Sequence, residues 1–155
     1  CPLAIETSGH AAFRENYFLD DGAYLMTKII IKTASLGKEN KELSSLISSL
    51  KEPKESKEIR LNIFTEDFRA YGEKVIEELK AFAEKTDGYI LADDNFEGVK
   101  VSFGKDDGDG WFLLRLSVHD PVMPLNIESD SVGGAEKIEQ KAREFLAKYE
   151  FLGKF

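Results

Sequence analysis

Residues 110–129 read GWFLLRLSVHDPVMPLNIES, and this stretch decides the fold that we expect. It begins as a strand, because aromatic and apolar residues directly follow a cluster of glycine and aspartate. Pro121 interrupts the pattern, since proline has no backbone donor for a sheet ladder. Met123, Leu125 and Ile127 then alternate with polar residues, which is the period of a second strand. The stretch therefore predicts two strands joined by a polar loop.

Arg115 and Ser117 come at the end of the first of these strands. Side chains two residues apart in a strand lie on the same face. A guanidinium presents a planar fork of donors that fits two phosphate oxygens, and a neighbouring hydroxyl can bond a third. The amides of Val118 and His119 can complete a small anion-binding concavity. The alternative is that Arg115 pairs with a carboxylate of this acidic chain and that Ser117 caps the turn.

The composition is that of a folded globular protein, with 155 residues of which 42% are hydrophobic and 32% charged. The net charge of −8 argues against a surface for duplex nucleic acid, which requires clustered lysine and arginine. No apolar run approaches the about 20 residues that span a bilayer. The single cysteine, Cys1, cannot form an internal disulfide. We therefore expect a cytoplasmic protein that binds neither nucleic acid nor membrane.

The first ten residues, CPLAIETSGH, read as the end of a strand that enters a loop, so we expect the chain to be a piece of a longer protein. Glu6, Ser8 and His10 place a carboxylate, a hydroxyl and an imidazole close to the flexible Gly9. Such groups suit sugar hydroxyls and proton transfer near neutral pH. The alternative is a plain polar loop in which His10 is only hydrogen-bonded.

Two helices are expected before the middle of the chain. The first covers residues 20–37, with Asp20 or Asp21 as its cap and its apolar residues on one broad face. The second covers residues 41–51, where leucine and isoleucine form a stripe. We expect the apolar face of residues 1–37 to dock on a neighbouring element or on another copy, because a large exposed patch is a liability.

Residues 52–57, EPKESK, are charged and contain Pro53, which makes them the predicted linker. The chain would then consist of residues 1–51 and residues 58–155.

The segment after the linker alternates strands with helices. Helices are expected at 68–86 and after Gly134, and strands at 59–63, 89–91, 99–103, 111–117 and 123–127. Strands bunched between helices predict an α+β fold, a two-layer unit with a mostly antiparallel four-stranded sheet and helices on one face. The other face of such a sheet can stay open, and it would carry Arg115 and Ser117.

Residues 106–110, DDGDG, resemble part of an acidic loop for a divalent metal. Trp111 and Phe112 follow where further ligands would be needed. A hairpin turn explains the glycines and aspartates more simply. We therefore predict a turn here and no metal site.

The two candidate loops together resemble the α-D-phosphohexomutases, the phosphomannomutase/phosphoglucomutase superfamily. The sugar-recognition loop of that family's third domain reads approximately G-E-x-S-G-H, where this chain has ETSGH at 6–10. The phosphate loop of its fourth domain reads approximately R-x-S-G-T-E-P, where this chain has RLSVHDP at 115–121. The order and separation of the two motifs extend the resemblance over essentially the whole chain.

The resemblance implies that residues 1–51 are the helical end of an α/β domain and that residues 58–155 are a TATA-binding-protein-like C-terminal domain. Glu6 and Ser8 would bond hexose hydroxyls, and His10 would be a candidate for proton transfer. The residues that would hold the phosphate that is not transferred are Arg115, Ser117, Val118 and His119. The chain departs from the motif at Val118, His119 and Asp120, where a threonine hydroxyl is lost and the His119 ring N–H is its expected substitute.

The family's phosphoserine and its magnesium loop belong to domains that have no counterpart in this chain. The resemblance therefore implies that magnesium and a hexose 1,6-bisphosphate activator serve a full-length parent, and that this piece alone has no mutase activity. Its expected partners are a phosphosugar and the remaining domains of the parent, over which the C-terminal part would close as a lid. The alternatives are a stand-alone phosphosugar- or anion-binding module and a structural sheet domain.

Overall fold

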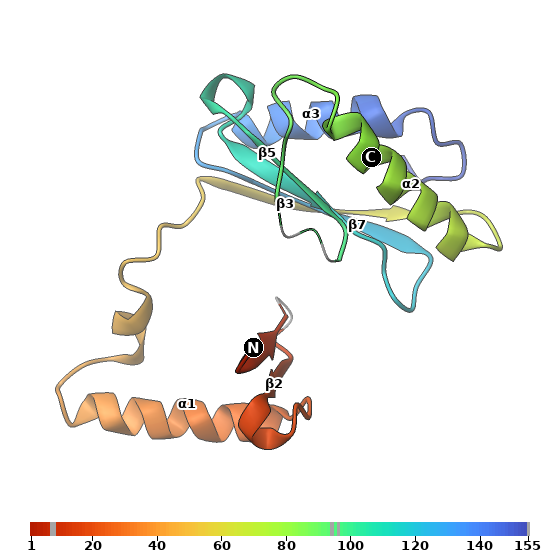
Figure 1. Cartoon of the computed structure of the whole chain (residues 1–155). Helices are drawn as coiled ribbons and strands as arrows, with labels where there is room; N and C mark the ends of the chain where they lie inside the picture. The colour runs from red at the N-terminus through yellow and green to blue at the C-terminus, as the bar shows by residue number, and fades with distance from the viewer. Residues whose placement is uncertain (7–8, 94, 96, 155) are drawn as a thin grey trace. The chain divides into compact units, whose positions relative to one another are not determined.

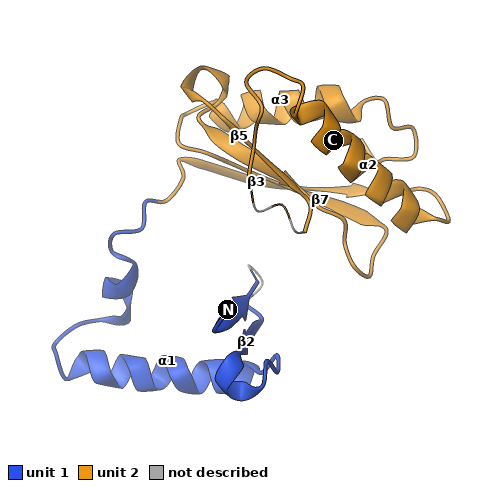
Figure 2. Cartoon of the chain, viewed as in Figure 1, with its two compact units in different colours: residues 1–51 blue, residues 52–155 orange. Residues whose placement is uncertain are grey.

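A computed structural model of the chain describes residues 1–6, 9–93, 95 and 97–154. These residues divide into two units, which we call unit 1 (residues 1–51) and unit 2 (residues 52–155) (Figure 2). Unit 1 contains a short hairpin and one long helix, whereas unit 2 contains a sheet and two helices (Figure 1). In the described part of the chain, no helix is both long and apolar enough to cross a bilayer.

Unit 1 begins with strands β1 (Leu3–Ile5) and β2 (Ala11–Phe13), which pair in antiparallel fashion. A 3-10 turn, η1 (Arg14–Asn16), leads to helix α1 (Gly22–Gly37). The Tyr24 amide donates a 3.0 Å hydrogen bond to the Asp21 carboxylate. The predicted first helix and its aspartate cap are thus confirmed.

The second predicted helix, over residues 41–51, is wrong. The segment forms only a 3-10 turn, η2 (Leu43–Ile47). Serine side chains explain the difference, because the Ser45 hydroxyl bonds the Glu42 carbonyl and the Ser48 hydroxyl bonds the Ser45 carbonyl. Serines that bond nearby backbone groups compete with a regular helix.

Helix α1 leaves most of its apolar side chains uncovered. Only Leu36 is buried, whereas Met26, Ile30 and Ile31 are 63%, 62% and 61% exposed. The docking of this face on another element or another copy stays a prediction.

The sheet of unit 2 has the order β3-β7-β6-β5-β4, and every neighbouring pair is antiparallel. Its strands are β3 (Glu55–Asn62), β4 (Ile90–Leu91), β5 (Val99–Phe103), β6 (Gly110–Leu114) and β7 (Val122–Ser129). The α+β class and the antiparallel sheet are confirmed. The sheet has five strands rather than the four predicted, because the short segment at β4 pairs with the edge of β5.

Strand β3 begins inside the predicted linker, residues 52–57. Glu55 pairs with Ser129 of β7, so the last part of that segment is sheet. The Glu55 carboxylate also accepts hydrogen bonds from the amides of Gly133 (2.7 Å) and Ala135 (2.9 Å). A carboxylate at these orphan amides stabilises the helix that they start. This charged residue therefore has two structural roles that a linker pattern does not indicate.

Helices α2 (Phe68–Ala83) and α3 (Gly134–Leu146) both cover the same face of the sheet (Figure 1). Helix α2 ends before the predicted boundary at Thr86, whose hydroxyl instead donates to the Phe82 carbonyl. Fully buried residues of both helices and four strands form the core between the layers: Leu61, Val75, Leu79, Val101, Leu114, Leu125, Ile127 and Ile138.

The glycine- and aspartate-rich segment forms the predicted hairpin connection. A 3-10 turn, η3 (Lys105–Asp107), is followed by Gly108 with a φ of +121°. A β-carbon at Gly108 would lie 2.6 Å from the Ile138 Cγ1 atom, so only glycine fits both the backbone angle and the packing. The turn thus brings β6 back along β5 and against α3.

Candidate functional site

Strand pairing between β6 and β7 continues past Leu114. The Arg115 amide donates to the Pro124 carbonyl at 3.1 Å, and the Ser117 amide donates to the Val122 carbonyl at 3.0 Å. These bonds continue the register of the two strands, which assigns Arg115 to the sheet face opposite the helices, whereas Ser117 also lines a cavity beside α2. We call the face opposite the helices the open face.

The Arg115 guanidinium is the main candidate for a phosphate ligand. Its side chain is partly exposed, and no hydrogen bond or ion pair joins it to another residue that the structure describes. Pairing with a carboxylate, the alternative interpretation of Arg115, is not observed among the residues that the structure describes. Its planar donors are available to an oxyanion.

Ser117 does cap the turn, as its alternative interpretation proposed. Its Oγ atom accepts a 3.3 Å hydrogen bond from the Asp120 amide. An oxygen that accepts a bond in this way keeps its own hydrogen, which can still be donated. Capping and phosphate binding by Ser117 are therefore compatible.

The loop after Ser117 presents two backbone donors. Val118, His119 and Asp120 are exposed, and neither the Val118 nor the His119 amide donates to a residue that the structure describes. Two such amides can contribute to an anion site, whereas the Asp120 carboxylate in the same loop would oppose an anion. The balance of charge in the loop therefore depends on Arg115.

Two glycines, Gly72 and Gly98, allow close packing against residues 114–116, and sequence reasoning missed both. A β-carbon at Gly98 would collide with the Leu114 carbonyl oxygen and lie 2.9 Å from the Arg115 Cβ atom. A β-carbon at Gly72, within α2, would lie 2.5 Å from Leu116. A glycine inside a helical pattern often has such a packing reason, and this was the available signal.

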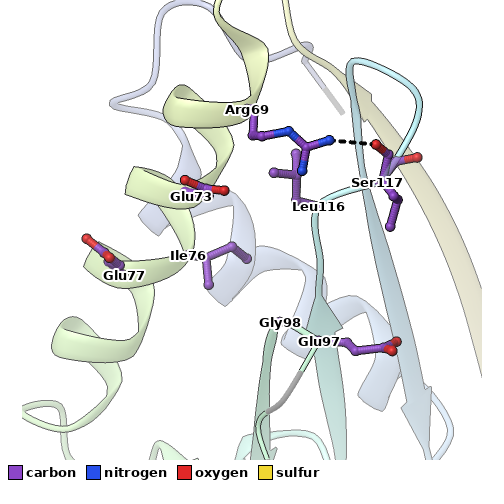
Figure 3. A pocket seen from close by; sticks show the side chains of 9 residues that line it. Arg69, Glu73, Ile76, Glu77, Glu97, Gly98, Leu116 and Ser117 are labelled. Atoms are coloured by element: carbon purple, nitrogen blue, oxygen red, sulfur yellow. Dashed lines mark hydrogen bonds between the residues drawn. The ribbon is translucent and has the colours of Figure 1, made fainter.

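A cavity of about 360 Å³ lies between α2 and the end of β6 (Figure 3). Its lining residues are Arg69, Glu73, Ile76, Glu77, Glu97, Gly98, Leu116, Ser117 and Val118. Three glutamates make this cavity unsuited to a phosphate. Ser117 and Val118 line this cavity as well, but Arg115 does not, so the candidate anion site is centred on Arg115 rather than on the cavity.

Sequence reasoning also missed Arg69, which extends from α2 toward the loop (Figure 3). Its Nη2 atom donates a 2.8 Å hydrogen bond to the Val118 carbonyl. Nothing in the local sequence pattern points to this contact, because 49 residues separate the two partners.

The candidate sugar loop of unit 1 is the tip of the β1–β2 hairpin. The Glu6 amide donates to the His10 carbonyl at 2.9 Å, and the Gly9 amide donates to the Glu6 carbonyl at 3.0 Å. Gly9 has a φ of +89°, which glycine adopts without strain. Ser8, the third candidate of this loop, falls outside the described residues.

His10 is held by an aspartate. Its Nδ1 atom lies 2.7 Å from the Asp20 Oδ2 atom, and both side chains are exposed. This hydrogen bond and the charge of Asp20 raise the pKa of His10 above its ordinary value. The imidazolium form therefore persists to higher pH than in an unpaired histidine, and with Nδ1 bonded to Asp20 the Nε2–H is the proton that a ligand could receive.

Comparisons with known proteins show which proteins the chain is similar to. No family model matches the chain. The chain is 30% identical over 140 residues to the phosphoglucomutase of Neisseria gonorrhoeae, covering 90% of this chain and 28% of that protein. It is 31% identical over 145 residues to a phosphomannomutase/phosphoglucomutase of Pseudomonas aeruginosa, covering 93% of this chain and 28% of that protein.

A solved structure has a similar fold. The crystal structure of a phosphoglucomutase/phosphomannomutase family protein from Burkholderia thailandensis matches 99% of this chain and 30% of its own, with a TM-score of 0.68 and 28% identity.

The five-stranded antiparallel sheet with two helices on one face, together with these relatives, defines the class of fold to which the chain belongs. The chain belongs to the phosphoglucomutase/phosphomannomutase superfamily and corresponds to a C-terminal part of its members. It spans about 28% of the length of the curated relatives that it matches.

Proposed function

We propose that this chain is the substrate-recognition part of a phosphohexomutase that interconverts hexose 1-phosphate and hexose 6-phosphate. The names of its relatives support this reaction class. The single observation that carries the proposal is Arg115 on the open face, beside the Ser117 hydroxyl and without a carboxylate partner among the described residues. An arginine without a carboxylate partner keeps all of its donors for a phosphate.

In this proposal the loop binds the phosphate that is not being transferred. Arg115 donates two parallel hydrogen bonds to two of its oxygens, and the Ser117 hydroxyl donates a third. The amides of Val118 and His119 add backbone donors to the same group. The His119 ring N–H takes the place of the threonine hydroxyl of the family motif.

The hairpin tip of unit 1 supplies contacts to the sugar. Glu6 and Ser8 accept hydrogen bonds from hydroxyls of the hexose ring. His10, held as an imidazolium by Asp20, donates a proton from its Nε2 atom near the reacting end. A mutase of this kind binds its substrate in two opposite orientations, so the same hydroxyl ligands and the same phosphate clamp serve both half-reactions.

Unit 2 acts as a lid on the rest of the enzyme. Closure over a bound sugar phosphate would exclude water from the phosphoryl-transfer step. A separate unit with the clamp within it, joined to the preceding unit through residues 52–54, suits such a movement.

Phosphoryl transfer itself is assigned to other parts of the parent enzyme. Among the described residues, no group of three histidine, cysteine, aspartate or glutamate side chains is arranged to hold a metal ion. A magnesium ion and a hexose 1,6-bisphosphate activator belong to the proposed parent, in the cytoplasm.

Calorimetry and a coupled assay test the proposal together. We expect the 155-residue chain to bind glucose 1-phosphate and to give no turnover when the bisphosphate activator is added. The Arg115→Ala variant should lose most of the binding. Turnover by this chain above the blank would contradict the division of labour, and unchanged binding by Arg115→Ala would contradict the clamp.

A stand-alone module for phosphosugars or other anions is the second candidate. It is favoured by the observation that the whole phosphate loop and its supports lie within unit 2. Such a module would bind inorganic phosphate and glucose 1-phosphate with equal affinity, whereas a mutase part that also contacts the sugar should prefer glucose 1-phosphate.

A further inference from the structure

The hydrogen bond from Arg69 to the Val118 carbonyl also orients the peptide group between Val118 and His119. Val118 is followed by a trans peptide bond, since no cis peptide occurs among the described residues. In a planar trans peptide the C=O and the next N–H point in opposite directions. A Val118 carbonyl directed at α2 therefore directs the His119 N–H away from α2.

The side away from α2 is the side of the open face. Helix α2 covers the core face of the sheet, and the continued register of β6 and β7 assigns Arg115 to the opposite face, whereas Ser117 lies at the edge and also lines the cavity beside α2. The His119 amide thus points to the same side as Arg115. The His119 amide donates to no described residue, so it is available to a ligand.

Arg69 bonds the Val118 carbonyl rather than a nearby carboxylate. Glu73 lies one helical turn along α2, yet no ion pair joins it to Arg69 in the described structure. A basic residue placed N-terminal to an acidic one at this spacing is the weaker orientation for a helix pair. The guanidinium instead reaches the loop, and Gly72 lets Leu116 pack closely against the same turn of α2.

We propose that Arg69 is a positioning residue for the phosphate loop: it orients the Val118–His119 peptide so that the His119 amide donates to the bound phosphate. The inference rests on the function proposed above and adds a residue that lies on the far side of the loop. Arg69 does not touch the phosphate in this arrangement. Arg69 affects phosphate binding only by orienting the backbone of the loop.

The test is a titration of the 155-residue chain with inorganic phosphate, followed by the backbone amide signals in nuclear magnetic resonance spectra. The variants are Arg69→Met, which keeps side-chain length without a donor, and Arg69→Lys, which keeps one donor. The control is Lys80→Met, because Lys80 is exposed on α2 about three turns away and carries the same charge.

We expect Arg69→Met to weaken phosphate binding by about 5- to 10-fold, the effect of one charge-assisted hydrogen bond on the loop. It should abolish the phosphate-induced shift of the His119 amide while the shift of the Ser117 amide remains. Arg69→Lys should restore most of the affinity, and Lys80→Met should bind as the unchanged chain does. Melting temperatures should stay similar throughout, because both residues are exposed.

Three results would overturn the inference. If Arg69→Met binds phosphate with unchanged affinity and an unchanged His119 shift, the loop does not need this contact. If Lys80→Met weakens binding as much as Arg69→Met, net charge alone explains the effect. If the unchanged chain shows no saturable shift at Arg115, Ser117 or His119, the phosphate site itself fails and the proposed function falls with it.

Discussion

The Asp120 amide donates a hydrogen bond to the Ser117 hydroxyl oxygen across the tip of the candidate phosphate loop, at 3.3 Å. One side chain therefore closes the turn and still keeps a hydroxyl hydrogen that it can donate. The loop is shaped before a ligand arrives. A preformed loop lowers the ordering cost that binding would otherwise carry.

Ser117→Ala should weaken binding of glucose 1-phosphate by about 3- to 10-fold, because one donor to the phosphate is lost and the Asp120 amide loses its acceptor. Ser117→Thr keeps the hydroxyl and should bind nearly as well as the unchanged chain. Calorimetry on the three proteins measures the difference. Equal affinities for Ser117→Ala and the unchanged chain would remove the hydroxyl from the site.

Gly98→Ala should lower the free energy of unfolding by about 2 kcal/mol or more, because it adds both a strained backbone and a collision. Gly98 has a φ of +140°, and a β-carbon there would meet the Leu114 carbonyl. The matched control is Gly104→Ala, where φ is −71° and no atom lies within 4 Å of the added carbon. Urea titrations should show a large loss for the first variant and almost none for the second.

Much of unit 2 could be predicted from the sequence, because period-two and helical patterns dominate its elements. The hairpin at residues 106–110 and the open-face position of Arg115 followed from turn chemistry and strand alternation. The start of β3 could not be predicted, since Glu55 is charged and its partners, Ser129 and the α3 amides, are distant in sequence.

The residues of the candidate site that the sequence did not predict also depend on contacts between distant segments. Arg69 acts across 49 residues on a backbone carbonyl, and no local pattern encodes such a contact. The constraint on Gly98 comes from its close approach to the Leu114 carbonyl, which belongs to strand β6. At η2 (Leu43–Ile47), the helical spacing of the apolar residues predicted a helix, although the serines favour a 3-10 turn.

Asp20→Asn should lower the pKa of His10 toward its ordinary value of 6.5, because the hydrogen bond and the charge of Asp20 are the main causes of the upward shift. A raised pKa keeps the imidazolium to higher pH, so proton donation by His10 is lost only as pH rises through that raised value. In Asp20→Asn the loss should occur at lower pH. Titration of the His10 ring signals measures both values.

Asp21→Asn is the control for that experiment, since Asp21 caps α1 and does not bond His10. It should leave the His10 titration where it is in the unchanged chain. An Asp20→Asn titration that coincides with that of the unchanged chain would show that the pair does not form in solution.

Glu139→Gln should reduce the free energy of unfolding at neutral pH by about 1–3 kcal/mol, since Glu139 is buried and holds two cations. Lys57 donates to it at 2.9 Å, and the Arg143 Nε atom donates at 2.8 Å. The hydrogen bond from Lys57 is the largest cause that keeps the pKa of Glu139 below its ordinary value of 4.5, and Arg143 adds to it.

A lowered pKa fixes the sign of the pH dependence. The stabilisation by Glu139 is complete above the unfolded value and is lost as pH falls through the lower folded value. The difference between the unchanged chain and Glu139→Gln should therefore shrink in acid. The exposed Glu150→Gln is the control and should differ little at any pH. A constant difference from pH 7 to acid would contradict the assignment.

The most direct measurement of the central claim is the affinity of glucose 1-phosphate for the unchanged chain, for Arg115→Lys and for Arg115→Ala. If Arg115 binds the phosphate through its planar guanidinium, the affinity should be highest for the unchanged chain, lower for Arg115→Lys and lowest for Arg115→Ala. The affinity should fall by about 10-fold or more from Arg115→Lys to Arg115→Ala. Equal affinities across the three proteins, or no binding by the unchanged chain, would contradict the account.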